Sequence, residues 1–121
     1  MKNKIYYENF KDAIERNKKK IPAVHKKLKA AGVQYVMSSW IDLHGIPKTK
    51  PVPMSDFEPL CLGKGPQFAV HSISFVPELT PADSDQIMLP DLDSVYICPW
   101  DKTIAIIFAD LYWEDKPYNV C

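Results

Sequence analysis

The chain has 121 residues, of which 46% are apolar and 25% charged, and its formal net charge is zero. This length fits one domain, and this composition is typical of an ordinary globular protein with enough apolar side chains for a core. No apolar run approaches the roughly 20 residues that a membrane helix needs, and no secretory signal is visible at the start. The three cysteines are far apart and odd in number, which favours reduced thiols over a disulfide framework or a zinc site. We therefore expect a cytoplasmic protein.

The charges are unevenly distributed along the chain. Residues 1–50 carry twelve Lys/Arg against four Asp/Glu, whereas residues 51–121 carry three against eleven. A basic half is compatible with binding to nucleic acid or to an acidic membrane surface. Because no nucleic-acid-binding motif surrounds these lysines, we favour a solvated helix and expect neither nucleic acid nor a membrane as a partner.

Residues 9–31 have a helical pattern, with Asn9 as a candidate N-cap and Gly32 as a candidate C-cap. Pro22 interrupts this pattern, because the residue before a proline avoids helical geometry. The sequence thus predicts two helices, or one helix with a break near residues 20–21. We regard residues 1–32 as a basic helical segment and residues 33–121 as the domain that it precedes.

The period then becomes alternating, which predicts a strand from Val33 to Trp40. His44 and Gly45 form a tight turn, and a return strand covers residues 46–52. Because its prolines cannot donate a ladder hydrogen bond, we expect this strand to lie at a sheet edge or to be irregular. The S-x-x-E pattern of residues 55–58 predicts a capping box that opens a short helix.

Residues 63–86 have weak periodicity and are predicted to form a long loop, and residues 89–93 to form a turn entering a strand. Two strands, residues 94–100 and 103–113, close the chain around a turn at Asp101 and Lys102. A further turn is expected at residues 114–117. Together these elements predict an α+β fold, in which a small mixed or antiparallel sheet carries amino-terminal helices on one face.

Local chemistry alone assigns no activity to the chain. It contains no phosphate-binding loop of the P-loop type and no H-E-x-x-H motif, and its histidines are not at metal-ligand spacing. His25 is expected to be solvent-exposed on the helix and His44 to be a turn residue. Clustered carboxylates can bind Mg²⁺ or act as acid and base, but here turn formation is the favoured interpretation of Asp83, Asp85, Asp91 and Asp93. We therefore predict no metal site in this chain.

The order of five segments is more informative than any one of them. Residues 33–48 contain a strand that ends in an aspartate, then a glycine turn, then a strand that begins with a lysine. This series, with the segments that follow it, resembles the glutamine synthetase family. Residues 68–73 take the place of the family's F-D-G-S-S-I loop and residues 85–91 that of its D-x-x-L-x-P-D segment. Residues 99–110 match a strand that carries an aspartate, and residues 115–118 match a G-x-P-Y turn. The resemblance covers residues 33–121 and is most marked toward the γ-glutamylmethylamide synthetase branch.

The resemblance implies a β-grasp amino-terminal domain, with the catalytic domain outside this chain. In that family ATP and Mg²⁺ or Mn²⁺ bind the catalytic domain, glutamate is phosphorylated on its side-chain carboxylate, and an amine attacks the acyl phosphate. Subunits form rings that stack into decamers or dodecamers. Each active site lies between the β-grasp domain of one subunit and the catalytic domain of the next. The expected cofactors and partners therefore belong to a full-length parent enzyme.

The resemblance also implies site residues, namely Phe68, Ala69, His71 and Ser72, in what we call the amine-side loop (residues 68–72). Ser72 matches the second serine of the family motif, and His71 takes the place of the first. Ala69 stands where the family has an aspartate that binds ammonium. Either the loop has a different register, or a catalytic-domain carboxylate replaces the aspartate, or the acceptor is another amine, for which an apolar pocket is suitable.

Two alternatives to the ligase domain stay open at this point. The first is a stand-alone β-grasp module that binds another protein and has no catalytic role. The second is a nucleic-acid-binding domain that uses the basic helical segment of residues 9–31.

Overall fold

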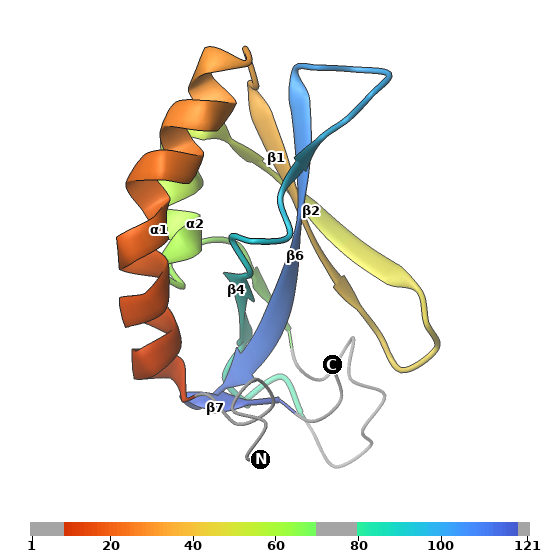
Figure 1. Ribbon diagram of the computed structural model, residues 1–121. Coiled ribbons are helices and arrows are strands. Elements are labelled where there is room, and N and C mark those ends of the chain that lie inside the picture. Colours follow the sequence, from red (N-terminus) through yellow and green to blue (C-terminus); the bar gives the residue numbers. More distant parts are fainter. Residues whose placement is uncertain (1–8, 70–79, 119–121) are drawn as a thin grey trace, which may run out of the picture.

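The computed structural model describes residues 9–69 and 80–118. Within these residues the chain forms two α-helices and seven strands around one sheet (Figure 1). The elements in chain order are α1 (Phe10–Ala30), β1 (Tyr35–Ile41), β2 (Pro47–Pro53), the 3₁₀ turn η2 (Met54–Asp56), α2 (Phe57–Cys61), β3 (Gln67–Phe68), β4 (Gln86–Pro90), β5 (Tyr96–Ile97), β6 (Ile104–Trp113) and β7 (Lys116–Pro117).

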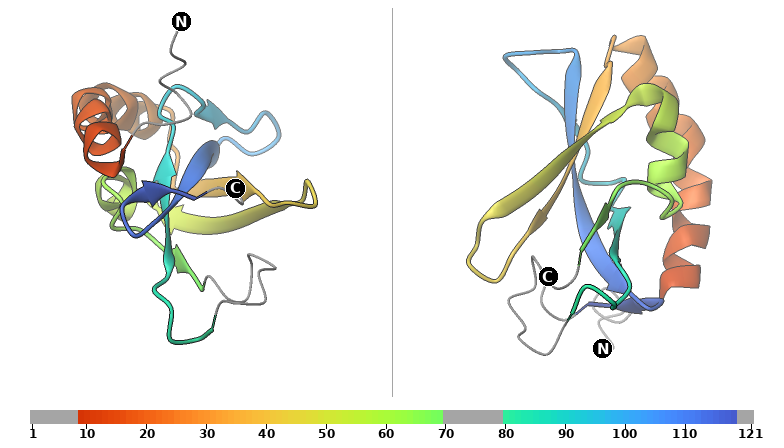
Figure 2. Two further views of the ribbon diagram at one scale, coloured as in Figure 1. Left: turned by 90° about the horizontal axis from the view of Figure 1, so that it is seen from below. Right: turned by 180° about the vertical axis from the view of Figure 1, so that it is seen from behind.

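The sheet is mixed and is organised around β6. The strand order is β2-β1-β6-β4-β3, and β5 and β7 also pair with β6. β1 runs parallel to β6, whereas the other pairings are antiparallel. The two helices lie on the same side of the sheet (Figure 2). The expected α+β fold, with a small mixed sheet and amino-terminal helical structure packed on it, is confirmed.

Helix α1 begins and ends as the sequence predicts, but it is not broken. Asn9 caps it, since its Oδ1 accepts a hydrogen bond from the Asp12 amide at 2.9 Å, and Gly32 has a positive φ of 84° just after its end. The predicted break at Pro22 is wrong, because the helix continues through this residue. Pro22 lies on the exposed face, where water can hydrate the carbonyl of Lys18 that lacks its usual amide donor.

Packing against the sheet holds α1 in place. Ile21 and Leu28 join the main core, which also contains Val36, Phe57 and Ile107. The first turns of the helix pack on the other end of the sheet, where a smaller cluster contains Ala13, Leu89 and Tyr112. Tertiary burial along both ends of a 21-residue helix thus outweighs the cost of one proline. His25, expected to be exposed, is instead half-buried, with its ring 6.0 Å from that of Phe57.

The β1–β2 hairpin follows the prediction closely. Gly45 turns the chain with a φ of 74°, and β2 is an edge strand. The amide of Met54 donates to the carbonyl of Gln34, so the even-numbered residues of β2 are those whose amides face β1. Pro47, Pro51 and Pro53 therefore occupy positions whose missing N–H would point away from the sheet. They cost no ladder bond and leave the edge unable to pair with another strand.

The segment after the hairpin differs from the prediction in two respects. The S-x-x-E pattern of residues 55–58 does not form a capping box: residues 54–56 form a 3₁₀ turn, and Asp56 precedes α2 without a side-chain cap bond. The predicted long loop of residues 63–86 contains β3, which pairs with β4 through Gln67 opposite Ile87. Residues 70–79 of that loop lie outside the described residues.

Strand β4 was missed by the sequence analysis. Residues 86–90 pair with β6 and are almost completely buried, and the predicted turn begins only after them, at Asp91, and leads into β5. A strand buried on both faces lacks the alternation that identifies half-buried strands.

The predicted strand of residues 94–100 is reduced to the two residues of β5, and β6 spans almost all of the predicted strand of residues 103–113. The turns at Asp101 and at residues 114–117 are confirmed.

Although β2 and β3 are at opposite edges of the strand order, the sheet curls until they meet. The ammonium group of Lys50 on β2 donates a hydrogen bond to the carbonyl of Gln67 on β3. The side chain of Trp40 on β1 contacts Phe68 on β3 in the same way across the curl. The amine-side loop therefore begins where the two edges of the sheet approach each other.

The buried side chain of Asn17 links α1 to α2 and to β4, and it gives the first prediction. The Nδ2 group of Asn17 donates to the carbonyl of Cys61 at 2.9 Å and to that of Pro90 at 3.1 Å. We expect Asn17→Ala to lower the free energy of unfolding by about 2–3 kcal/mol, because two buried carbonyls lose their donor. Urea unfolding of the two proteins measures this difference. Lys19→Ala on the exposed face of α1 is the control and should change stability by less than about 0.5 kcal/mol; equal effects of the two substitutions would contradict the assigned role.

Candidate functional site

The structure places two of the four predicted site residues. Phe68 ends β3 and Ala69 follows it, and both are half-buried. His71 and Ser72 lie outside the described residues. The Phe68 ring meets the indole of Trp40 edge to face, with the ring centroids 5.8 Å apart and an interplanar angle of 77°. This geometry is a favourable one for aromatic pairs and holds the ring of Phe68 against β1.

Phe68 covers a small apolar cluster on the concave side of the curl. Its fully or nearly buried members are Trp40, Met88, Ala109 and Leu111, with Phe68 and Tyr118 packed against them. The indole N–H of Trp40 is buried and has no hydrogen-bond partner among residues 9–69 and 80–118. The start of the amine-side loop thus rests on a rigid, mainly apolar base.

The cationic side chain of Lys50 borders this base. The ammonium nitrogen of Lys50 lies 4.3 Å from the centroid of the Phe68 ring, within the range of a cation–π contact. The same group donates to the Gln67 carbonyl. Among the described residues, no carboxylate forms a salt bridge with Lys50. The position next to Phe68 is therefore aromatic on one side and positively charged on the other.

The aspartate and the lysine that flank the glycine turn serve the hairpin itself. The Oδ1 atom of Asp42 accepts hydrogen bonds from the amides of His44, at 2.8 Å, and of Ile46, at 2.9 Å. Lys48 lies 3.4 Å from the other carboxylate oxygen. The pKa of Asp42 is lowered below its ordinary value, chiefly by the hydrogen bond from the Ile46 amide. The His44 amide and the Lys48 ammonium group lower it further. This buried carboxylate fixes the turn, and the Asp-Gly-Lys pattern is a folding feature.

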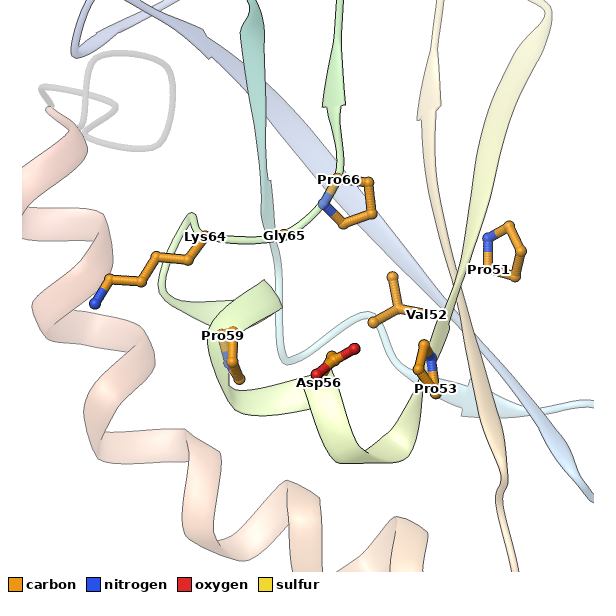
Figure 3. A pocket seen from close by; sticks show the side chains of 8 residues that line it. All are labelled: Pro51, Val52, Pro53, Asp56, Pro59, Lys64, Gly65 and Pro66. Atoms are coloured by element: carbon orange, nitrogen blue, oxygen red, sulfur yellow. The ribbon is translucent and has the colours of Figure 1, made fainter.

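A cleft of about 380 Å³ lies between β2 and the chain that leads into β3. Figure 3 shows that the Asp56 side chain lies among its prolines, whereas the Lys64 side chain points away, toward α1. The lining residues come from β2 and from the chain that leads to β3, namely Pro51, Val52, Pro53, Asp56, Pro59, Lys64, Gly65 and Pro66. Four prolines make this wall stiff, which restrains the chain that leads to Gln67 and Phe68.

Asp83 and Asp91 accept local hydrogen bonds in turns, as predicted, whereas Asp93 also reaches α1. Asp91 accepts a hydrogen bond from the Asp93 amide at 2.9 Å, and Asp93 pairs with Lys20 of α1 at 2.5 Å. The Thr80 amide donates to Asp83 at 2.7 Å. The described residues contain no group of three or more His, Cys, Asp or Glu side chains that could hold a metal ion. Asp110 lies within β6, three residues before its end.

Neither described cysteine has the setting of a nucleophile. Cys61 and Cys98 are both buried and unpaired by disulfides, as predicted. Burial raises the pKa of the Cys61 thiol to about 12, and the nearby charge of Glu58 adds to this effect. In the described part of the chain the site therefore consists of an aromatic ring, a small residue and a cation, an arrangement that can position a substrate but offers no general base.

The sequence analysis missed Lys50 and Trp40 as part of this site. Both lie in segments that it assigned correctly to strands, but they are 18 and 28 residues from Phe68, respectively. An edge strand with an interior lysine is a common solubility feature and gives no hint of a partner. Only the curl of the sheet brings these side chains to β3.

Comparison with known proteins gives the family. No protein-family model matches the chain. The glutamine synthetase of Rhizobium meliloti (strain 1021) is 38% identical over 86 residues, or 71% of this chain and 19% of that protein. The glutamate–methylamine ligase of Methyloversatilis universalis is 29% identical over 94 residues, or 76% of this chain and 21% of that protein. The chain thus spans about a fifth of the length of the relatives that it matches.

Solved structures of the methylamine ligase GmaS have the same fold. A GmaS complex with ADP matches with a TM-score of 0.71 and 25% identity over 78% of this chain and 21% of that chain. GmaS without ligand matches with a TM-score of 0.70 and 26% identity. Fold and sequence together define a domain of the glutamine synthetase type, and the resemblance to that family is confirmed. The chain belongs to the glutamine synthetase family and corresponds to the amino-terminal domain, as in GmaS.

No helix in residues 9–69 and 80–118 is both long and apolar enough to cross a lipid bilayer.

The lowered pKa of Asp42 gives the second prediction. Its folded-state pKa is below the ordinary value of 3.8, so its contribution to stability is full above that value and is lost as the pH falls through the folded pKa. Asp42→Asn keeps an acceptor for the turn amides but cannot ionise. We expect the loss of stability between about pH 5 and pH 2 to be shallower in this variant than in the wild type, as measured by urea unfolding over a pH series. Glu114→Gln, on an exposed turn, is the control; a slope as steep in Asp42→Asn as in the wild type would contradict the prediction.

Proposed function

We propose that this chain is the amino-terminal domain of an ATP-dependent glutamate–amine ligase and that it supplies part of the active site of a neighbouring subunit. The observation that carries the proposal is the agreement of sequence and fold with glutamine synthetases and GmaS over more than two-thirds of the chain. In this reading the amine-side loop lines the entrance of the acceptor amine. The parent enzyme is a cytoplasmic, ring-forming homo-oligomer, either a decamer or a dodecamer.

The open face of the sheet supports a role for the domain within a larger assembly. Tyr35, Tyr96 and Phe108 are 49%, 43% and 42% exposed. The strand register puts them on one face, since Tyr35 lies opposite Ile104, Ser39 opposite Phe108 and Ile106 opposite Tyr96. Exposed aromatic side chains gathered on one face are typical of surfaces that another protein element covers. A catalytic domain or a neighbouring subunit of the parent enzyme would fit this face.

The chemical steps would be divided between the two domains. ATP and Mg²⁺ or Mn²⁺ would bind the remainder of the parent enzyme, which would activate the glutamate side chain as an acyl phosphate. This domain would contribute binding and orientation, because the half-buried Phe68 and Ala69 present an apolar surface at the start of the amine-side loop. Holding the amine close to the acyl phosphate converts a bimolecular attack into an effectively unimolecular step.

The chemistry of residue 69 favours an alkylamine as the acceptor. An alanine offers no negative charge to an ammonium ion, and its methyl group adds apolar surface next to the Phe68 ring. One buried methyl group of the substrate gains roughly 0.8 kcal/mol, whereas an ammonium ion without a charge partner gains nothing in return for its lost hydration. Both effects change selectivity in the same direction, toward methylamine.

The third prediction concerns the isolated chain. We expect residues 1–121 alone to show no ligase activity and no measurable affinity for Mg-ATP, because the proposal assigns the nucleotide and metal ligands to the remainder of the parent enzyme. Isothermal titration calorimetry with Mg-ATP tests this, with the full-length protein as the positive control. Binding of Mg-ATP to the 121-residue chain with micromolar affinity would contradict this prediction.

The fourth prediction concerns the acceptor amine of the full-length parent. We expect kcat/KM for methylamine to be at least equal to that for ammonia, and Ala69→Asp to shift this ratio toward ammonia by about tenfold, since a carboxylate restores a charge partner for ammonium. Steady-state assays with both amines give the ratio.

Ala69→Ser is the matched control for that substitution, because it adds a polar group without a charge and should leave the ratio nearly unchanged. A clear preference of the wild type for ammonia would refute the alkylamine assignment and leave the ligase assignment intact. A full-length protein with no ligase activity toward any amine would instead favour a stand-alone β-grasp module that binds another protein.

A further inference from the structure

We propose that Lys50 is a positioning residue of the amine site. Its side chain holds Gln67, Phe68 and Ala69, where the amine-side loop begins, in the orientation that the acceptor amine requires. The inference rests on the proposed function, since it assigns Lys50 a task within that site. It concerns a side chain on the β1–β2 hairpin, far from the loop in sequence.

The contacts of Lys50 link two strands that share no backbone pairing. Its ammonium group donates to the carbonyl of Gln67 and lies 4.3 Å from the centroid of the Phe68 ring. β2 and β3 occupy opposite edges of the sheet, with β1, β6 and β4 between them. Lys50 therefore acts as a cross-link between the two edges, and it makes this link through two consecutive residues of β3.

β3 needs such a link because its own hold on the sheet is small. It is only two residues long, and within the described residues β4 is the only strand that pairs with it, through Gln67 opposite Ile87 and Phe68 opposite Gln86. A two-residue strand at an edge supplies few ladder hydrogen bonds, so its position depends on side-chain contacts. Lys50 holds the ring of Phe68 from one direction, and the edge-to-face contact with Trp40 holds it from another.

The neighbouring lysine shows that this role is specific to Lys50. In the hairpin register Lys48 lies opposite Trp40 and Lys50 opposite Ser38, so the two lysines share one face of the hairpin. Lys48 pairs with Asp42 at the hairpin turn. Among the described residues no carboxylate pairs with Lys50, whose ammonium group is directed to the backbone carbonyl and the aromatic ring of β3. The chain thus provides a matched control two residues away.

Two substitutions of Lys50 separate its charge and donor from its bulk. Lys50→Met keeps an unbranched apolar chain that can pack on Phe68 but cannot donate to Gln67. Lys50→Arg keeps both a donor and a cation that stacks on an aromatic ring. Lys48→Met removes a lysine from the same face without touching β3. All three are made in the full-length protein.

The first measurement is amide hydrogen exchange across residues 67–69, which reports the hold on β3 whatever the reaction is. The second is steady-state kinetics with methylamine, glutamate and ATP varied in turn. We expect Lys50→Met to speed exchange at 67–69 and to lower kcat/KM for methylamine by about tenfold, because misplacement of a binding element by an ångström is costly. The KM values for glutamate and ATP should stay within about twofold of the wild type. Lys50→Arg should largely keep the wild-type exchange rate and the wild-type kcat/KM for methylamine. Lys48→Met should change neither quantity.

Two results would overturn the assignment. Unchanged exchange at residues 67–69 in Lys50→Met would show that the contact does not hold the loop. Faster exchange accompanied by an equal loss for all three substrates would show a general structural role. If the wild-type full-length protein has no ligase activity, the proposed function fails and the assignment to an amine site fails with it, while the exchange data still show whether Lys50 holds β3.

Discussion

The structure depends on the pairing of one strand, β6, with nearly every other part of the sheet. β1, β4, β5 and β7 all form their ladders with it, one of them parallel and the rest antiparallel. The alternate residues Ala105, Ile107, Ala109 and Leu111 are buried under the helices at one end and under the curl at the other. A strand used on both edges must satisfy two registers at once, so its position determines where the hairpin, the helices and the short strands can lie.

The strong curl of this sheet links the folding core to the candidate site. Because the sheet is narrow and twisted, its two edges approach each other, and side chains of β1 and β2 reach β3. The prolines of β2 prevent the outer edge from pairing with a further strand, while its lysines remain available for contacts across the curl. The same geometry that closes the small apolar cluster around Trp40 thus presents Phe68 and Ala69 at the rim.

Under the proposed function, the described residues would position a substrate for chemistry performed by the rest of the parent enzyme. They combine a rigid aromatic base, a cation and stiff proline walls, and the buried carboxylate of Asp42, whose pKa is lowered, belongs to a structural turn. In enzymes whose active sites are shared between subunits, such an element contributes orientation, whereas activation of the substrate depends on the other side. The exposed aromatic residues of the open sheet face agree with this division of work.

The sequence by itself determined the features that depend on local chemistry: the Asn9 cap, the Gly45 turn, the edge position of the proline-rich strand, the buried cysteines and the ordered segments that indicate the glutamine synthetase family. Only the tertiary structure decided the rest. Burial at both ends kept α1 continuous through Pro22, and β4 was hidden because a strand buried on both faces shows no alternation. The surroundings of Phe68 could not be foreseen either, because they arise where two edges distant in sequence meet, and that meeting is a property of the twist of the whole sheet.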